Sequence, residues 1–329
     1  MKEQGAPIEM QKAAEYERPM TGRIETLLHN AERSGVRAAM VVAKRDANDP
    51  DGNYRVVLQH GSDVRMHPAS TIKVAIALYL AEAKLVELTS QQLTDEQAVD
   101  WHDFRDEDFV PGGGIFDQPD APRSASYMRL IQDMLCDSRS GNMAAKLLVG
   151  RAGTEAFNEF WANKGAETIR LNAKGDWYEI ERASAADLMK VLEEIPKLDN
   201  EQVSQQVASY IHLFMLCGSG SIGTVSGALE RTSRMQLLTK TGKLPPDDED
   251  PYHSRHDIGI LDSSDGTSYA YVMMTQAPTL SGLIAAQEMI DGVGALLAHE
   301  AGLQTPSRTR RLLAVTALRT SGVMKRFKS

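Results

Sequence analysis

The chain has 329 residues, of which 42% are hydrophobic and 25% are charged, so it is long enough for one large domain or two interleaved ones with a sizeable core. Its net charge of −9 argues against a general nucleic-acid-binding protein. Its two cysteines, Cys136 and Cys217, are too few for a disulfide framework and stand in no metal-ligand spacing with histidine. A single bridge between them remains an open alternative.

The two ends of the chain differ from its middle. Residues 1–21 are predicted to be a flexible leader, because they contain no apolar segment of signal-peptide length. No run of about 18 apolar residues occurs, so we expect no membrane span. We expect a cytoplasmic protein as numbered, or an exported one if a leader was removed. The tail, residues 303–329, carries seven basic residues and no acid. It either contacts an anionic surface or remains a solvated, partly disordered segment.

The first half of the chain is predicted to hold one hairpin followed by helices. Apolar runs over 36–43 and 54–59 flank a cluster of turn-forming residues, which predicts a β-hairpin. Helices are predicted over residues 21–31, 70–88, 126–137, 141–149, 155–163 and 188–194. Ser184 is the expected cap of the last helix, with Asp187 completing a capping box. Residues 112–114 are glycines without the pattern of a nucleotide-binding loop, so we interpret them as a turn.

The second half returns to strands. After a helix over 202–216, β-rich runs cover residues 235–241, 257–261 and 269–274, and a helix over 281–298 follows. Because strands stand at both ends of the chain, we predict an α/β (α+β) fold with a five-stranded antiparallel sheet, packed terminal helices and an inserted all-helical lobe. The expected boundaries are 22–64 with 206–302 for the α/β lobe, and 65–205 for the helical lobe.

A serine and a lysine stand at the expected start of the first helix of that insertion. Pro68 precedes a long apolar segment, which places Ser70 at or just inside the helix N-terminus. Lys73 follows three residues later and shares the helical face of Ser70. The pair could act as a nucleophile and a proton acceptor. Alone, it is equally typical of a helix cap and a lysine that reaches solvent.

Two further patterns follow in order, Ser140-Gly141-Asn142 and Lys240-Thr241-Gly242. Together with Ser70-x-x-Lys73 they form the set S-x-x-K, S-D-N and K-T-G, with one departure in the middle triplet. By these residues the chain resembles the class A β-lactamase and penicillin-binding superfamily of serine acyl hydrolases. The resemblance covers roughly residues 22–302 and implies the same two-lobed, β-lactamase/transpeptidase-like fold.

The resemblance assigns roles to the residues of these motifs. Ser70 would attack the substrate carbonyl, Lys73 would serve as base with its pKa lowered by desolvation and a second ammonium, and Ser140 would relay a proton to the leaving nitrogen. The residues expected to bind substrate are Asn142, Lys240, Thr241, Gly242, Lys243 and Arg255. The backbone N–H groups of Ser70 and Lys243 would form the oxyanion hole. Gly242 would let substrate lie against the strand edge.

Two departures from the family pattern limit this assignment. Gly141 replaces an aspartate that is chiefly structural. The E-x-x-L-N loop that carries the deacylating glutamate is absent, and the corresponding interval, 170–182, looks short. Glu179 and Glu181 are candidate replacements, as is Asp176, although a solvated acid is the more usual identity of an acidic loop residue. We therefore expect the acyl-enzyme to form and to hydrolyse slowly.

The predicted function is that of a serine hydrolase that opens β-lactam rings through an acyl-serine intermediate. The alternatives are a D,D-peptidase-like or esterase-like hydrolase, and a non-catalytic descendant that binds cell-wall ligands. We expect no cofactor and no metal, a small-molecule β-lactam or peptidoglycan-like partner, no nucleic acid, and a monomer.

Overall fold

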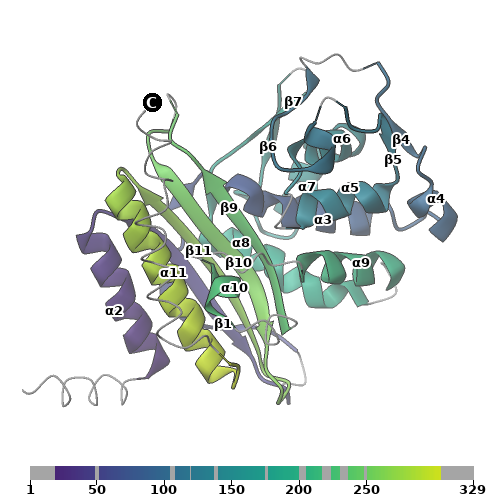
Figure 1. Ribbon diagram of the computed structural model, residues 1–329. Helices are drawn as coiled ribbons and strands as arrows, with labels where there is room; N and C mark the ends of the chain where they lie inside the picture. The colour runs from purple at the N-terminus through teal and green to yellow at the C-terminus, as the bar shows by residue number, and fades with distance from the viewer. Residues whose placement is uncertain are drawn as a thin grey trace, which may run out of the picture.

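The computed structural model describes residues 19–48, 52–103, 108–118, 120–136, 140–174, 177–199, 205–216, 224–229, 236–247 and 250–304. A five-stranded antiparallel sheet separates two terminal helices from a larger group of helices (Figure 1). This architecture confirms the predicted fold. The leader before residue 19, the basic tail beyond 304, Asp176 and Cys217 lie outside the described residues, so the expectations for them stay open.

The sheet has the order β2-β1-β11-β10-β9. Its strands are β1 (Arg37–Arg45), β2 (Arg55–His60), β9 (Leu237–Leu244), β10 (His253–Asp262) and β11 (Ser268–Ala277). The inner strands are apolar on both faces because both faces are covered. Successive residues of β1 alternate between two cores: Met40 packs toward the terminal helices, and Val41 packs toward the opposite side of the sheet.

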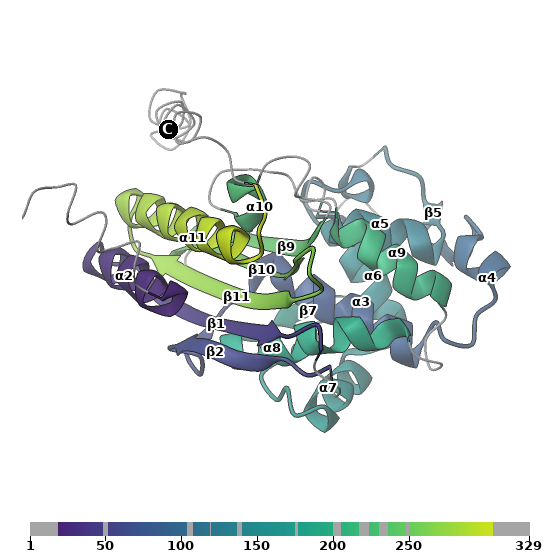
Figure 2. The same cartoon turned by 90° about the horizontal axis from the view of Figure 1, so that it is seen from below.

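Two terminal helices cover one face of the sheet. They are α2 (Met20–Arg33) and α11 (Leu280–Glu300), and they lie side by side in both views, with α10 (Val225–Ala228) beside α11 (Figures 1 and 2). Among the described helices, α11 has the length and composition of a membrane span, which corrects the expectation that no segment meets that criterion. Its contacts with β10, β11, α2 and α10 account for that composition, because a helix covered on several sides must be apolar.

The opposite face carries the inserted helices around α3 (Ile72–Ala83), whose residues 72–81 are all buried. Around it pack α5 (Tyr127–Leu135), α6 (Asn142–Ala152), α7 (Thr154–Asn163), α8 (Ala185–Glu194) and α9 (Gln205–Met215). The α4 helix (Ser90–Thr94) and the 3₁₀ turns η1 (Ala69–Thr71), η3 (Ile115–Asp117) and η4 (Ile195–Asp199) complete this side. Although we expected residues from 206 onward to pack with the sheet, α9 packs chiefly against α5.

Three short two-stranded sheets also occur in the inserted segment, where the sequence predicted helices and loops. They are β3 (Arg65–Met66) with β8 (Ala183–Ser184), β4 (Val99–Asp100) with β5 (Ser124–Ala125), and β6 (Leu171–Lys174) with β7 (Trp177–Ile180). The predicted helix over 70–88 ends at Ala83. Ser184 caps α8 as expected, but Asp187 bonds Thr168 and Lys190 instead of completing the capping box.

Candidate active site

Ser70 lies in the middle of η1, one turn before α3, and is half-buried. Pro68 begins this turn, since its carbonyl accepts hydrogen bonds from the N–H of Thr71 at 3.2 Å and the hydroxyl of Thr71 at 2.6 Å. The preceding residue, Ala69, has a φ of +50°, which L-residues rarely adopt. Ser70 therefore precedes the regular helix in a tight turn, at a backbone position that the surrounding structure must hold.

Two histidines hold this turn. His67 Nδ1 accepts a hydrogen bond from the N–H of Ala69 at 3.0 Å. His256, fully buried on β10, lies 2.8 Å from the carbonyl of His67 through Nε2, and its Nδ1 accepts from the N–H of Thr275 at 3.1 Å. Burial lowers the pKa of His256 to about 4, so its ring is neutral and donates through Nε2–H. The sequence analysis missed both residues, although the position of His67 beside Pro68 was a usable signal.

Lys73 brings α3 into contact with the middle motif. Its ammonium donates to the carbonyl of Ser140 and to Oδ1 of Asn142, both at 2.7 Å, and lies 3.4 Å from the Ser140 hydroxyl oxygen. The side chain is 3% exposed. Asn142 also donates through Nδ2 to the carbonyl of Pro111 at 2.8 Å, which uses one of its two amide hydrogens. The structure thus joins two of the three motifs through one buried ammonium group.

Lys240 approaches the same serine from the sheet. It is fully buried on β9, and its ammonium donates to Ser140 Oγ at 3.0 Å and to the carbonyl of Thr241 at 3.3 Å. Ser140 has a φ of +50°, and its N–H donates to the carbonyl of Cys136 at the end of α5. Because Lys240 can only donate, the hydroxyl oxygen of Ser140 accepts this hydrogen bond. The hydroxyl hydrogen of Ser140 can then be donated to another acceptor. The third motif therefore meets the second at this hydroxyl.

Gly242 serves to pack β9 against the serine turn. A Cβ at this position would lie 2.9 Å from the carbonyl oxygen of Pro68 and 3.1 Å from Cβ of Ala69, which is closer than real side chains approach. The glycine therefore lets the third motif approach η1, and its expected role of leaving room for substrate stays a prediction. The next residue, Lys243, is exposed.

A cavity of about 330 Å³ opens beside Ser70. It is lined by His67, Ala69, Ser70, Lys73, Val110, Asn142, Glu179, Ile180, Lys243 and Leu244. The serine turn, the middle motif and the end of β9 thus share one cavity, as the sequence motifs predicted. Within the described ranges, no group of three or more histidine, cysteine or acidic side chains has the arrangement of a metal site.

Arg255 is not among the residues that line this cavity. It is 3% exposed and pairs with Lys243 and Thr275 across the sheet. Adjacent strand residues point to opposite faces, and its neighbour His256 faces the serine turn. Arg255 therefore points toward the face covered by the terminal helices. Lys243, its cross-strand partner, lies on the same face of the sheet, and the role of Arg255 in binding a carboxylate stays a prediction.

The two candidate deacylating acids lie at the same end of the β6–β7 hairpin but have different neighbours. Glu179, on β7, is exposed and lines the cavity together with Ser70 and Lys73. Glu181 lies just beyond the strand, and its Oε1 is 3.6 Å from Nε of Arg170. Of the two glutamates, only Glu179 is thus placed at the cavity.

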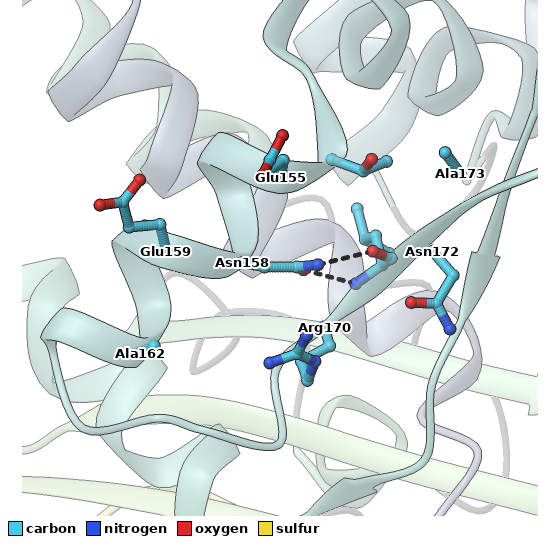
Figure 3. Close-up of a pocket in the computed structure, with 9 residues that line it drawn as sticks. Glu155, Asn158, Glu159, Ala162, Arg170, Asn172 and Ala173 are labelled. Atoms are coloured by element: carbon cyan, nitrogen blue, oxygen red, sulfur yellow. Dashed lines mark hydrogen bonds between the residues drawn. The ribbon is translucent and has the colours of Figure 1, made fainter.

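The hairpin is attached to α7 by one asparagine (Figure 3). Asn158 Nδ2 donates to the carbonyl of Leu171, and Oδ1 accepts from the N–H of the same residue, both at 2.8 Å. Leu171 is paired in the hairpin with Ile180, and Asn172 with Glu179. Asn158 thus makes the two backbone hydrogen bonds that a neighbouring strand would otherwise make. These bonds fix the part of the hairpin that reaches the cavity. The outer side of this junction is a second, shallow pocket with Glu155, Glu159 and Arg170 on its rim (Figure 3).

Comparison with known proteins agrees with this fold and identifies the family. Residues 23–301 match the profile of the Beta-lactamase enzyme family. The β-lactamase from Sphaerobacter thermophilus is 18% identical, aligns over 86% of this chain and 98% of its own, and has a TM-score of 0.64. PBP-A is 18% identical over 86% and 97% of the two chains, with a TM-score of 0.66. TLA-3 extended-spectrum β-lactamase is 17% identical over 85% and 98%, with a TM-score of 0.65. A mutant of PBP-A was solved as an acyl-enzyme complex with penicillin G. No curated protein matches the chain.

Proposed function

The chain belongs to the β-lactamase enzyme family, and from this premise we propose that it is a serine hydrolase acylated at Ser70 by β-lactam substrates. One observation carries the proposal: Lys73 and Lys240 converge on Ser140 beside the cavity that contains Ser70. A nucleophile, a base, a proton relay and a positively charged binding edge are the parts that acyl transfer requires.

The first half of the reaction is acylation. Lys73, as the neutral amine, takes the proton of Ser70 while the serine oxygen attacks the carbonyl carbon of the ring amide. The backbone N–H groups of Ser70 and Lys243 stabilise the negative charge that develops on the carbonyl oxygen. The carbon–nitrogen bond then breaks, and the ring nitrogen receives a proton through Ser140. The serine is left as an ester.

Substrate is held by the end of β9 and by Asn142. Lys243 is exposed in the cavity and offers its ammonium to a substrate carboxylate, with the Thr241 hydroxyl beside it on the same strand. The free amide hydrogen of Asn142 is available to a substrate amide carbonyl. We assign carboxylate recognition to Lys243 and Thr241, and Arg255, the cross-strand partner of Lys243, lies beside them on the sheet.

The second half is hydrolysis of the ester, and we assign its base to Glu179. A carboxylate at the cavity wall can take a proton from the attacking water, after which the serine leaves as a hydroxyl. The exposure of Glu179 supports slow hydrolysis, because an acid in contact with bulk water is held less firmly in a productive geometry than a buried one.

The alternative is a D,D-peptidase-like or esterase-like hydrolase that uses the same nucleophile on another acyl group. The absence of the E-x-x-L-N loop favours it, because a peptidase or esterase does not depend on rapid hydrolysis of a β-lactam ester. A non-catalytic protein that binds cell-wall ligands is disfavoured by the intact set of Ser70, Lys73 and Lys240.

One experiment separates these functions. The protein is incubated with a fluorescent penicillin and with a chromogenic cephalosporin, and intact mass and absorbance are followed. We expect one penicilloyl adduct per chain, which Ser70→Ala abolishes and which Ser263→Ala, at the far end of β10, leaves unchanged. Persistent adduct without turnover supports the peptidase or esterase alternative. Absence of both adduct and turnover refutes the proposal.

A further inference from the structure

Within the described residues, the helix that begins at the middle motif receives no cap from its own N-cap residue. Gly141 is the N-terminal cap residue of α6, and it contributes no side-chain hydrogen bond to the helix. The first N–H groups of a helix need acceptors from elsewhere, and the residues that begin α6 also bind Lys73. Two aspartates distant in the sequence lie at this point, Asp117 in η3 and Asp133 in α5.

Asp117 caps the helix that Gly141 cannot cap. One of its carboxylate oxygens accepts from the N–H of Met143 at 2.8 Å, and the other from the N–H groups of Asn142 at 3.3 Å and Gly114 at 2.7 Å. Its side chain is 6% exposed. A buried carboxylate at a helix N-terminus satisfies free donors and complements the helix dipole. Asp117 thus binds the backbone of the residue whose side chain holds the ammonium of Lys73.

Asp133 occupies the space in which a side chain at position 141 would begin. A Cβ on Gly141 would lie 2.9 Å from Cγ of Asp133, and closer still to its Oδ2. Asp133 also accepts the N–H of Gly141 through its backbone carbonyl and that of Ile115 through Oδ1, both at 2.8 Å. It is fully buried. An aspartate at 141 and Asp133 in its present position therefore exclude each other.

The glycines of the 112–114 run complete this arrangement. A Cβ on Gly112 would overlap the carboxylate of Asp117, and a Cβ on Gly114 would overlap that of Asp133. The run therefore lets the chain pass close to both carboxylates, which gives it a structural purpose that the sequence patterns did not reveal.

We propose that Asp117 is a positioning residue for acylation, which together with Asp133 replaces the acid missing from the middle motif by fixing Asn142 and, through it, Lys73. This inference rests on the proposed function, because acylation of Ser70 is its readout. Asp117 touches neither substrate nor Ser70. Its loss should lower the limiting rate of acylation by a larger factor than it raises the concentration of penicillin at half-saturation, because Asn142 also contacts substrate while Lys243 and Thr241 still bind it.

The test compares Asp117→Ala with a cap removed elsewhere. Thr279→Ala removes the side chain that caps α11 through the N–H of Gly282 at 3.1 Å, on the other face of the sheet. For each folded variant, the limiting acylation rate by a fluorescent penicillin is measured beside the wild type. We expect a loss of about 10-fold or more in Asp117→Ala and less than about twofold in Thr279→Ala. Asp117→Asn keeps one oxygen acceptor but turns an NH2 donor toward the remaining N–H groups, so it should recover only part of the rate.

A second pair of variants tests the packing of Asp133 against Gly141 without a measurement of acylation. Gly141→Asp should be strongly destabilising alone and should be partly rescued by Asp133→Ala in the double variant, as measured by chemical unfolding. A folded Asp117→Ala that acylates at the wild-type rate, or a Gly141→Asp that is tolerated without the second change, overturns the inference. A wild-type protein that forms no adduct at Ser70 overturns the proposed function as well.

Discussion

The two sides of the cavity are held in different ways. On the side of the motifs, Lys73 and Lys240 are buried and each donates at least two hydrogen bonds, with Ser140 receiving from both. On the opposite side, Glu179 is an exposed residue of a short hairpin whose attachment to α7 includes the two hydrogen bonds of Asn158. The groups assigned to acylation are therefore buried and preorganised, whereas the group assigned to hydrolysis is exposed at the cavity wall. This difference predicts a fast first step and a slow second one.

Removing Lys73 should produce the largest effect. Lys73→Ala deletes the proposed base and leaves the acceptors of Ser140 and Asn142 without their shared donor. We expect acylation to slow by about 10³-fold, within the range for general acid–base catalysis. The decay rate of preformed adduct should change far less. An unchanged rate of labelling by fluorescent penicillin would refute the role of Lys73.

The free energy of unfolding should also depend on pH through a histidine on the motif side of the cavity. The pKa of His256 is lowered by burial to about 4, whereas an unfolded histidine titrates near 6.5. The unfolded chain therefore binds more protons between these values, and the free energy of unfolding falls as the pH drops from 6.5 toward 4. The loss should be on the order of 3 kcal/mol.

Chemical unfolding at a series of pH values checks this expectation. His256→Asn should flatten the pH dependence, because the buried titrating ring is gone, whereas His29→Asn, at an exposed position of α2, should leave it unchanged. An unaltered slope in His256→Asn would show that other groups, such as the neighbouring His67, account for the acid sensitivity.

On the hairpin side, Glu179→Gln should slow hydrolysis of the ester by about 100-fold and leave acylation within about twofold. Glu181→Gln is the matched control, since Glu181 belongs to the same segment but lies beside Arg170. Single-turnover kinetics with a chromogenic cephalosporin separate the two steps. Equal effects of the two substitutions would remove Glu179 from the mechanism.

A smaller effect is expected where the hairpin is attached. Asn158→Leu keeps the volume of the side chain but removes both hydrogen bonds to Leu171. We expect about 1–3 kcal/mol of lost stability from the unsatisfied backbone groups. Hydrolysis should slow severalfold, with acylation unchanged. If hydrolysis is insensitive to this change, the hairpin does not position its base.

The central strands of the sheet could be predicted because β1 and β11 are mostly apolar on both faces. The strand β1 buries Met40 on one face of the sheet and Val41 on the other. Its continuous run of apolar residues was therefore enough to predict a strand. The β6–β7 hairpin could not be predicted in this way, because it is short and Leu171 takes its hydrogen-bond partners from Asn158 on α7. A contact between two separate elements produces no recognisable pattern in the local sequence.

The site shows the same limit. The order of the three motifs was sufficient to predict that Ser70, Lys73, Ser140 and Lys240 lie close together. It could not reveal Asp117, whose contacts with α6 join residues 25 and 26 positions apart. Nor could it show which face of the sheet Arg255 occupies, because a shift of one residue in strand register moves a side chain to the other face.

The most direct test of the difference between the two sides is a pre-steady-state burst. Enzyme is mixed rapidly with excess chromogenic cephalosporin, and ring opening is followed from the first milliseconds. The account predicts a burst of about one equivalent per chain followed by a slow steady rate, with the burst absent in Ser70→Ala and unchanged in Glu179→Gln. Linear turnover without a burst, or a burst that persists in Ser70→Ala, would contradict it.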